Sequence, residues 1–323
     1  MMTYLNRRCT DAGTANCPCV LAETGDCLVC SRLAGRNECD CCWAGVCVYN
    51  EYIQNDKVVR NRRKNRIVPI LKKIRYGSDL MVMVLKVSKG FALQAMEPGA
   101  FVFINGIGEN DFFNMPVSVM RADVEKERLY IALKVISGKT KKAAEATEEL
   151  IVRGVYRNGF LGKGTAGLDE DRKNGGRWLV VTKGIGFAPA VNLLNWAGGR
   201  VNVDLIADLE KINEEMFDDN MRECMEKSGD SLTIRQGSLQ EMMKSFNEDK
   251  AVQYDRVILL TSDYYIRTIS QNMGVPEHKL VFCNNFRMCC GEGICGACSY
   301  VDNKGCVSKM CKCRGSHDII SSL

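Results

Sequence analysis

Three cysteines near the C-terminus have the spacing of an iron–sulfur site. Cys290, Cys295 and Cys298 follow a C-x4-C-x2-C pattern, with glycines beside them at 291, 293 and 296. Three thiolates can converge on one small inorganic core only in a tight loop, which glycine permits. This spacing is typical of plant-type 2Fe–2S proteins. Zinc prefers paired C-x2-C knuckles, and this segment has one such pair. The pattern therefore predicts a 2Fe–2S cluster.

A fourth thiolate must come from further along the chain. Cys306, Cys311 and Cys313 are the candidates. We favour Cys311, which follows Cys298 with C-x12-C spacing.

A second group of nine cysteines lies between Cys9 and Cys47. Nine thiols are enough for two four-thiolate sites. The candidate ligands are Cys17, Cys19, Cys27, Cys30, Cys39, Cys41, Cys42 and Cys47. Two interpretations stay open: additional iron–sulfur clusters, or structural zinc that folds a small domain lacking an apolar core. The irregular spacing is unlike a paired zinc ribbon, and with the downstream cluster motif it favours iron–sulfur.

Composition narrows the class of protein. The 323 residues allow about two domains, and the net charge of +5 argues against a dedicated nucleic-acid binder but leaves an acidic protein partner open. No apolar run reaches the ~20 residues of a membrane span. The N-terminus lacks the apolar centre of a secretory signal, so we expect a reducing cytoplasm and metal ligation rather than disulfides. The basic segment 57–66 is interpreted as a solvated linker or, alternatively, a docking strip.

The elements that position these cysteines fall into two patterns. Short apolar runs separated by turns predict an antiparallel barrel or sandwich over residues 63–167, with strands at Met81–Val87, Ala100–Ile104, Leu129–Val135 and Leu150–Val152. Strands then alternate with helices over residues 168–282, which predicts a parallel sheet of the nucleotide-binding type. The expected strands are Trp178–Thr182, Val201–Ala207 and Arg256–Leu260, and the expected helices are Pro189–Trp196, Lys211–Lys227 and Tyr264–Met273. A cysteine-rich segment (1–62) and a cluster segment (283–323) complete four expected parts.

From about Lys73 to Arg314 the chain resembles the electron-transfer subunit of dihydroorotate dehydrogenase, within the ferredoxin reductase-like flavoprotein superfamily. The resemblance rests on the C-terminal cluster motif, on the flavin segments 115–118, 137–140 and 158–160, and on the nucleotide segment 184–189. It implies an FAD-binding β-barrel, a Rossmann-like NAD(P)-binding domain and a C-terminal 2Fe–2S segment, in that order. The cysteine-rich N-terminus lies outside it.

Three segments resemble the family's flavin-binding residues. Met115-Pro116-Val117-Ser118 resembles the family's Arg-Pro-x-Ser, but methionine replaces the arginine that holds the FAD diphosphate there. Arg121 or Lys134 could compensate. The other two implied flavin segments are Ser137-Gly138-Lys139-Thr140 and Asn158-Gly159-Phe160.

The nucleotide domain is marked by a glycine turn between a strand and a helix. Gly184, Gly186 and Pro189 resemble the family's Gly-Gly-Gly-Ile-Gly-x-Ala-Pro, in which backbone approaches a pyrophosphate at a helix N-terminus. The family's later Cys-Gly-Pro turn, which faces the nicotinamide, is replaced by Thr261–Asp263.

The resemblance implies an electron-transfer subunit that passes electrons between NAD(P)H, FAD and iron–sulfur clusters. The expected partner is a catalytic flavoprotein subunit, of dihydroorotate dehydrogenase or glutamate synthase-like type, in a hetero-oligomer. No side-chain general base stands out. Two alternatives remain: a degenerate relay that has lost nicotinamide binding, and a metal-dependent redox sensor or scaffold.

Overall fold

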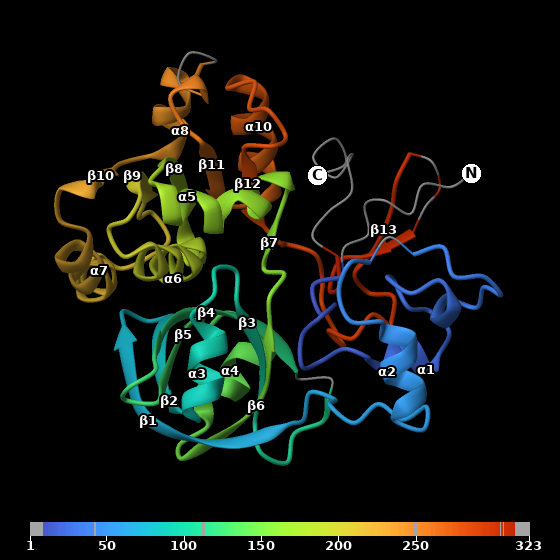
Figure 1. The fold of residues 1–323 in the computed structure, drawn as a ribbon. Coiled ribbons are helices and arrows are strands. Elements are labelled where there is room, and N and C mark those ends of the chain that lie inside the picture. Colours follow the sequence, from blue (N-terminus) through green and yellow to red (C-terminus); the bar gives the residue numbers. More distant parts are fainter. Residues whose placement is uncertain are drawn as a thin grey trace. The chain divides into compact units, whose positions relative to one another are not determined.

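The computed structural model describes residues 9–41, 43–111, 114–247, 251–303, 305 and 307–313. The chain divides into two compact units. One unit is essentially Arg66–Asn285, and the other combines the two ends of the chain, Met1–Asn65 and Phe286–Ile319. Figure 1 shows the elements of both.

The first half of the larger unit is a closed antiparallel barrel with strand order β1-β2-β5-β4-β3-β6. Its strands are β1 (Arg66–Tyr76), β2 (Leu80–Lys86), β3 (Phe101–Asn105), β4 (Met115–Asp123), β5 (Arg128–Lys134) and β6 (Glu149–Tyr156). Helices α3 (Lys89–Ala95) and α4 (Gly138–Glu145) add buried alanines to the barrel core. The four predicted strands of this region correspond to β2, β3, β5 and β6.

The second half is a six-stranded sheet with order β10-β9-β8-β11-β12-β7. Its strands are β7 (Phe160–Leu161), β8 (Arg177–Lys183), β9 (Asn202–Asp208), β10 (Leu232–Gln236), β11 (Arg256–Leu260) and β12 (Leu280–Cys283). All neighbouring strands are parallel except β7, which pairs with β12 in the antiparallel sense. The predicted barrel and parallel-sheet domain are therefore confirmed.

Helices and short 3-10 turns connect these strands. The helices are α5 (Leu168–Asn174), α6 (Phe187–Ala197), α7 (Glu214–Ser228), α8 (Leu239–Met242) and α10 (Asp263–Asn272). The 3-10 turns are η3 (Lys163–Gly167), η4 (Gly184–Gly186), η5 (Gly229–Ser231) and η6 (Met243–Ser245). Helix α7 begins later than predicted because the Asn213 side chain caps it, accepting a hydrogen bond from the Met216 backbone N–H at 3.1 Å.

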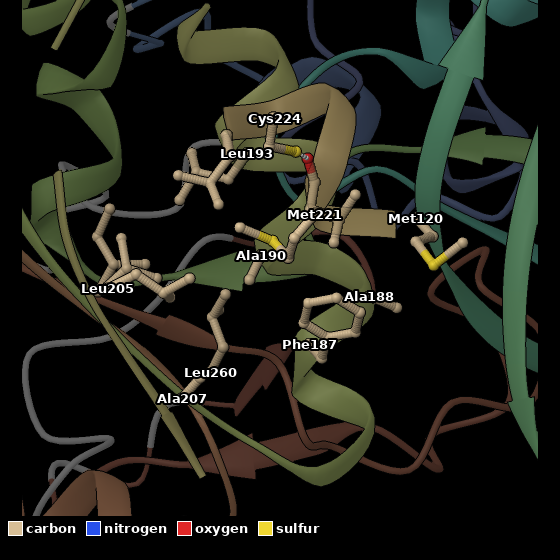
Figure 2. Close-up of a cluster of buried hydrophobic side chains, with 14 of the residues drawn as sticks. Met120, Phe187, Ala188, Ala190, Leu193, Leu205, Ala207, Met221, Cys224 and Leu260 are labelled. Carbon is tan, nitrogen blue, oxygen red and sulfur yellow. Dashed lines mark hydrogen bonds between the residues drawn. The ribbon is translucent and has the colours of Figure 1, made fainter. Parts of the chain in front are cut away.

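Helix α6 lies at the centre of the larger unit's core. Ten of its eleven residues are buried, so almost no face of the helix is left to solvent. Figure 2 shows Phe187, Ala190 and Leu193 of α6 among apolar side chains that include Leu205 of β9 and Met120 of the barrel strand β4. One apolar core therefore joins the barrel to the sheet.

The smaller unit has little regular structure. It contains α1 (Val20–Glu23), η1 (Arg32–Ala34), α2 (Val48–Gln54) and the two-stranded sheet of β13 (Ser299–Val301) and β14 (Val307–Lys309). Its N-terminal apolar cluster is small and includes Leu33, Val48 and Tyr52. In the part of the chain that the structure describes, no helix is long and apolar enough to cross a membrane.

Candidate functional site

The candidate cluster loop brings four thiols together within the smaller unit. The Cys311 thiol donates hydrogen bonds to the sulfur atoms of Cys290 and Cys298, and Cys290 also interacts with the Cys295 thiol. Backbone N–H groups point at the same sulfurs: Glu292 donates to Cys290 at 3.3 Å and Cys311 donates to Cys298 at 3.3 Å. These are the four cysteines that sequence analysis selected.

These hydrogen bonds shift the pKa values of the thiols in opposite directions. The bond from Cys311 and the N–H groups of Cys295 and Glu292 lower the pKa of Cys290 to about 3. The Cys311 side chain and backbone lower the pKa of Cys298 to about 6. The pKa of Cys311 is raised because it donates to both sulfurs and is buried. A lowered pKa favours the thiolate, which is the form that binds metals.

Metal-binding geometry is absent among the described residues, where no group of three or more His, Cys, Asp and Glu side chains is arranged to hold a metal ion. A 2Fe–2S core is bound by four thiolates shared between two iron atoms. The set of four thiols with N–H groups directed at sulfur fits a cluster in its donor chemistry, and cluster binding itself stays a prediction.

The other proposed fourth ligands are placed as follows. Cys313 is buried, and its backbone forms an antiparallel bridge with Cys9. Cys306 lies outside the described residues.

Several of the N-terminal cysteines lie close to one another in pairs. Cys27 and Cys30 share a knuckle in which the Cys30 N–H donates to the Cys27 sulfur at 3.4 Å. Burial, followed by the nearby thiolates of Cys19 and Cys27, raises the pKa of Cys17 to about 12. Cys39 and Cys41 are exposed and hydrogen-bonded to each other.

The two remaining candidate ligands in the N-terminal segment give no further contacts to other cysteines among the described residues. Cys47 is exposed at the start of α2, and Cys42 lies outside the described residues. The structure therefore does not divide these thiols into separate sites.

The flavin-motif residues lie on barrel strand β4. Pro116 pairs with Phe103 and Ser118 with Phe101 of β3, while Val117 is buried. Met115 stands where the family has arginine, and it is buried in the barrel core.

The two cations proposed to compensate for Met115 are already engaged. Arg121 forms an ion pair with Glu223 of α7 and lies over the Tyr130 ring, 3.9 Å from its centroid. Lys134 lies 3.4 Å from Asp79 and donates to the Lys211 carbonyl at 3.2 Å.

The segment Ser137–Thr140 is the N-terminus of α4 and forms a capping box. The Ser137 hydroxyl accepts from the Thr140 N–H at 3.3 Å, and the Thr140 hydroxyl accepts from the Ser137 N–H at 2.9 Å. These two amides are therefore satisfied internally, and Gly138 and Lys139 are the remaining residues of the predicted phosphate turn. The Lys139 ammonium donates to the Asn114 carbonyl at 3.4 Å, close to the start of the flavin motif.

The segment Asn158–Phe160 joins the barrel to the sheet. The Gly159 N–H donates to the Gly99 carbonyl at 2.9 Å, and the Asn284 side chain donates to the Asn158 carbonyl at 2.8 Å. Phe160 begins β7 and is buried. This segment therefore has a structural role, whether or not it also contacts a flavin.

The glycine turn lies at the carboxyl end of β8, where ligands bind in open parallel sheets. A Cβ at Gly186 would lie 1.9 Å from the Leu260 carbonyl oxygen, so only glycine lets α6 start this close to β11. Pro189 lies in the first turn of α6, as predicted. The preceding residue, Lys183, forms ion pairs with Asp208 at the end of β9 and with Glu210.

The turn Thr261–Asp263 follows β11 at the same edge of the sheet. The Cys283 thiol donates to the Thr261 carbonyl at 3.0 Å, and the Asn285 side chain donates to the same carbonyl at 3.0 Å and to Asp263 at 2.7 Å. This turn and the glycine turn end adjacent strands, since Leu260 of β11 pairs with Thr182 of β8.

Sequence analysis missed a group of charged residues beside the cluster loop. Lys312, next to Cys311, is fully buried, and its ammonium contacts Asp11 and Glu292. Arg63, expected to lie in a solvated linker or docking strip, is also buried and pairs with Asp11. No local pattern marks these residues, because Asp11 lies 301 positions from Lys312 and 52 positions from Arg63.

Comparisons with known proteins give a fold but no family. No family model matches the chain, and no curated protein matches it. Among solved structures, an NADH-dependent reduced ferredoxin-NADP oxidoreductase is similar with a TM-score of 0.54 and 18% identity, over 77% of this chain and 86% of that one. The Amycolatopsis cytochrome P450 reductase GcoB is similar with a TM-score of 0.50 and 12% identity, over 70% and 72% of the two chains. Both matches support the ferredoxin reductase-like fold, and the finer resemblance to the dihydroorotate dehydrogenase subunit stays a prediction.

Proposed function

We propose that this chain is an electron-transfer subunit of a flavin- and iron–sulfur-dependent oxidoreductase. The observation that carries the proposal is the meeting of Cys290, Cys295, Cys298 and Cys311 in one loop, with backbone N–H groups directed at two of the sulfurs. The fold supports it, because the two similar structures are named as reductases of ferredoxin-NADP and cytochrome P450 systems.

Each part of the chain has a distinct task in this proposal. The four thiols hold the cluster, and the Glu292 and Cys311 N–H groups stabilise charge on its ligands. The barrel strand β4 and the start of α4 would hold FAD, with Lys139 near both. Bound FAD exchanges a hydride for single electrons, and a 2Fe–2S cluster carries those electrons singly.

The flavin site fits its cofactor less closely than the cluster loop does. Met115 offers no fork of donors for a diphosphate, and Arg121 and Lys134 are held by acidic or carbonyl partners. The first turn of α4 offers backbone N–H groups suited to an anion, and Lys139 lies in that turn with its ammonium bonded to the Asn114 carbonyl. We therefore expect FAD to bind through this turn more than through the β4 motif.

The test is anaerobic purification of the full chain, with iron, sulfide and flavin analysis and electron paramagnetic resonance of the reduced protein. We expect a 2Fe–2S signal from the C-terminal site that Cys295→Ser abolishes, and any N-terminal cluster should give a separate signal that Cys295→Ser leaves intact. The matched control is Cys224→Ser, which changes a buried thiol in the core around α6 and should leave the signal intact. A wild-type protein with neither flavin nor a reducible cluster would contradict the proposal.

A second candidate is a relay that has lost nicotinamide binding. The observation that favours it is Lys183, whose ammonium is held by Asp208 and Glu210 at the turn where a pyrophosphate would approach. The Thr261–Asp263 turn offers the nicotinamide no equivalent of the family's Cys-Gly-Pro. Bleaching of the flavin by NADH or NADPH would exclude this candidate, and an unresponsive flavin would select it.

Two further proposals follow for the rest of the chain. The N-terminal thiols would bind additional iron–sulfur clusters, with structural zinc as the alternative that metal analysis separates. The expected partner is a catalytic flavoprotein subunit in a hetero-oligomer. Within the basic segment Arg62 pairs with Glu23, and the Arg63 side chain is buried. The exposed cations that the segment could offer this partner are Lys57, Arg60, Lys64 and Arg66.

A further inference from the structure

Four charged side chains are packed together where the two ends of the chain meet. The Lys312 ammonium donates to Asp11 Oδ2 at 2.7 Å and to Glu292 Oε2 at 2.8 Å. Arg63 donates to both carboxylate oxygens of Asp11, through Nη1 at 3.0 Å and also through Nη2, and its Nη1 lies 3.7 Å from Glu292. The group holds two cations and two anions, so its formal charge is balanced.

This charge network is deeply buried. Lys312 is 0% exposed and Asp11 3%, and the Arg63 side chain is 3% exposed. Burial alone would raise the pKa of Asp11, but the Arg63 hydrogen bond and the Lys312 charge hold it at about 2. Buried ion pairs are often no more stabilising than apolar residues of similar size. Stability alone therefore gives little reason for four charges here.

Two members of the network belong to the cluster loop. Glu292 lies between Cys290 and Cys295, and its N–H donates to the Cys290 sulfur. Lys312 directly follows Cys311. The other two members, Asp11 and Arg63, come from the cysteine-rich N-terminal segment.

Backbone and apolar contacts hold the N-terminal segment against the same loop. The Thr10 N–H donates to the Lys312 carbonyl at 2.8 Å, beside the bridge between Cys9 and Cys313. A Cβ at Gly293, where φ is +80°, would lie 3.1 Å from Leu21 of α1 and 3.3 Å from the Lys312 side chain. Leu21 therefore covers the middle of the loop, and Gly293 leaves the space for it.

We propose that Asp11 and Arg63 are positioning residues for the C-terminal cluster, which act through Lys312 and Glu292 to hold the loop and set the redox potential. This inference rests on the proposed function, because it presupposes a cluster at Cys290–Cys311. Reduction adds a negative charge to the cluster, so nearby charge and hydrogen bonds govern its potential. Partners beyond the ligands typically change metal affinity 10–100-fold.

The experiment compares Asp11→Asn, Lys312→Met and the double variant in the full chain. Asp11→Asn leaves an uncompensated cation and should raise the midpoint potential, whereas Lys312→Met leaves an uncompensated anion and should lower it. The double variant restores the charge balance, so its potential should lie between the two. Both single variants should lose iron to a chelator about 10–100-fold faster than wild type.

Two further variants separate charge from shape. Asp56→Asn is the matched control, because Asp56 pairs with Arg60 on the surface of the same unit and is not adjacent to any candidate ligand. It should change neither potential nor iron loss. Arg63→Lys keeps the charge but lacks the two-pronged guanidinium, so it should keep the potential and still lose iron faster.

Shifts in the same direction for both single variants, or shifts no larger than that of Asp56→Asn, would overturn the inference. If Asp11→Asn does not fold by circular dichroism, Asp11→Glu replaces it, and an unchanged iron-loss rate there would count equally against the inference. The underlying proposal fails separately. A Cys295→Ser variant with the same spectrum and iron content as wild type shows that no cluster is bound there, whereas a spectral component lost in Cys295→Ser but indifferent to Asp11 and Lys312 rejects only their positioning role.

Discussion

Replacing Gly186 by alanine tests how closely α6 approaches β11. The added Cβ would lie 1.9 Å from the Leu260 carbonyl oxygen, and contacts under 3.0 Å essentially never occur for real Cβ atoms. The start of α6 must then move by about 1 Å, which disturbs a helix buried on nearly every side. Overpacking of this kind costs ~1–3 kcal/mol. For a unit of this size the thermal midpoint should fall by roughly 2–12 °C.

The assay is thermal unfolding followed by tryptophan fluorescence. Trp178 is fully buried and stacks on Trp196 of α6, with ring centroids 6.5 Å apart, so these residues report on this core. Trp43 belongs to the other unit and is replaced by phenylalanine throughout.

The matched control is Gly90→Ala in α3, because nothing lies within 4 Å of the added Cβ there. It should stabilise the protein by up to ~1 kcal/mol. A Gly186→Ala midpoint within about 1 °C of wild type would refute the close approach. A midpoint raised like that of Gly90→Ala would refute it as well.

Three other perturbations test the larger unit. Lys183→Met leaves Asp208, which is 2% exposed, without its cation, so the free energy of unfolding in urea should fall by ~3–5 kcal/mol. The double variant Lys183→Met/Asp208→Asn should recover most of this loss. Burial alone would raise the pKa of Asp208, but Lys183 and the Leu239 N–H lower this pKa overall. The charged Asp208 therefore stabilises the fold above its unfolded pKa of ~3.9, and this stabilisation declines as the pH falls below that value. When unfolding is measured from pH 5 to 3, Asp208→Asn should lose less stability than wild type. Burial and the hydrogen bond to Asp219 raise the pKa of Tyr76 to about 12. Ionisation of Tyr76 should therefore lower the stability of wild type between about pH 10 and 12, a loss that Tyr76→Phe should not show. At pH 7 the loss of this hydrogen bond in Tyr76→Phe should cost ~1 kcal/mol of stability.

Apolar runs bounded by turns were sufficient to predict seven of the twelve strands that the structure describes in the larger unit, while β1, β4, β7, β10 and β12 were missed. Arg256–Leu260 coincides with β11, and the predicted strand at Trp178–Thr182 lies within β8. Such buried parallel strands are continuous apolar segments, so they need no alternation to be recognised. Strand β1 was missed because it starts in the basic segment, contains Pro69 and exposes most of its residues.

The candidate site was predictable only where its residues are close in sequence. Cys290, Cys295 and Cys298 are fixed by spacing, and Cys311 was selected by a longer spacing that the structure supports with direct contacts. Asp11 and Lys312 are 301 positions apart, so their ion pair has no signature in any local window. The charges of segment 57–66 suggested a solvated linker, but the Arg63 side chain is buried against Asp11, which lies 52 positions away in the sequence.

The make-up of the smaller unit has a consequence for its biogenesis. Its N-terminal part leaves the ribosome long before Glu292 and Lys312, because the whole of Arg66–Asn285 is translated in between. At ~5–20 residues per second, roughly 12–50 s separate the synthesis of Arg63 from that of Lys312. During that interval the N-terminal thiols and the Asp11–Arg63 pair lack their final packing partners. The packing between the N-terminal segment and the C-terminal loop therefore forms late, and a nascent chain arrested before Phe286 would leave the N-terminal cysteines open to premature oxidation or metal capture.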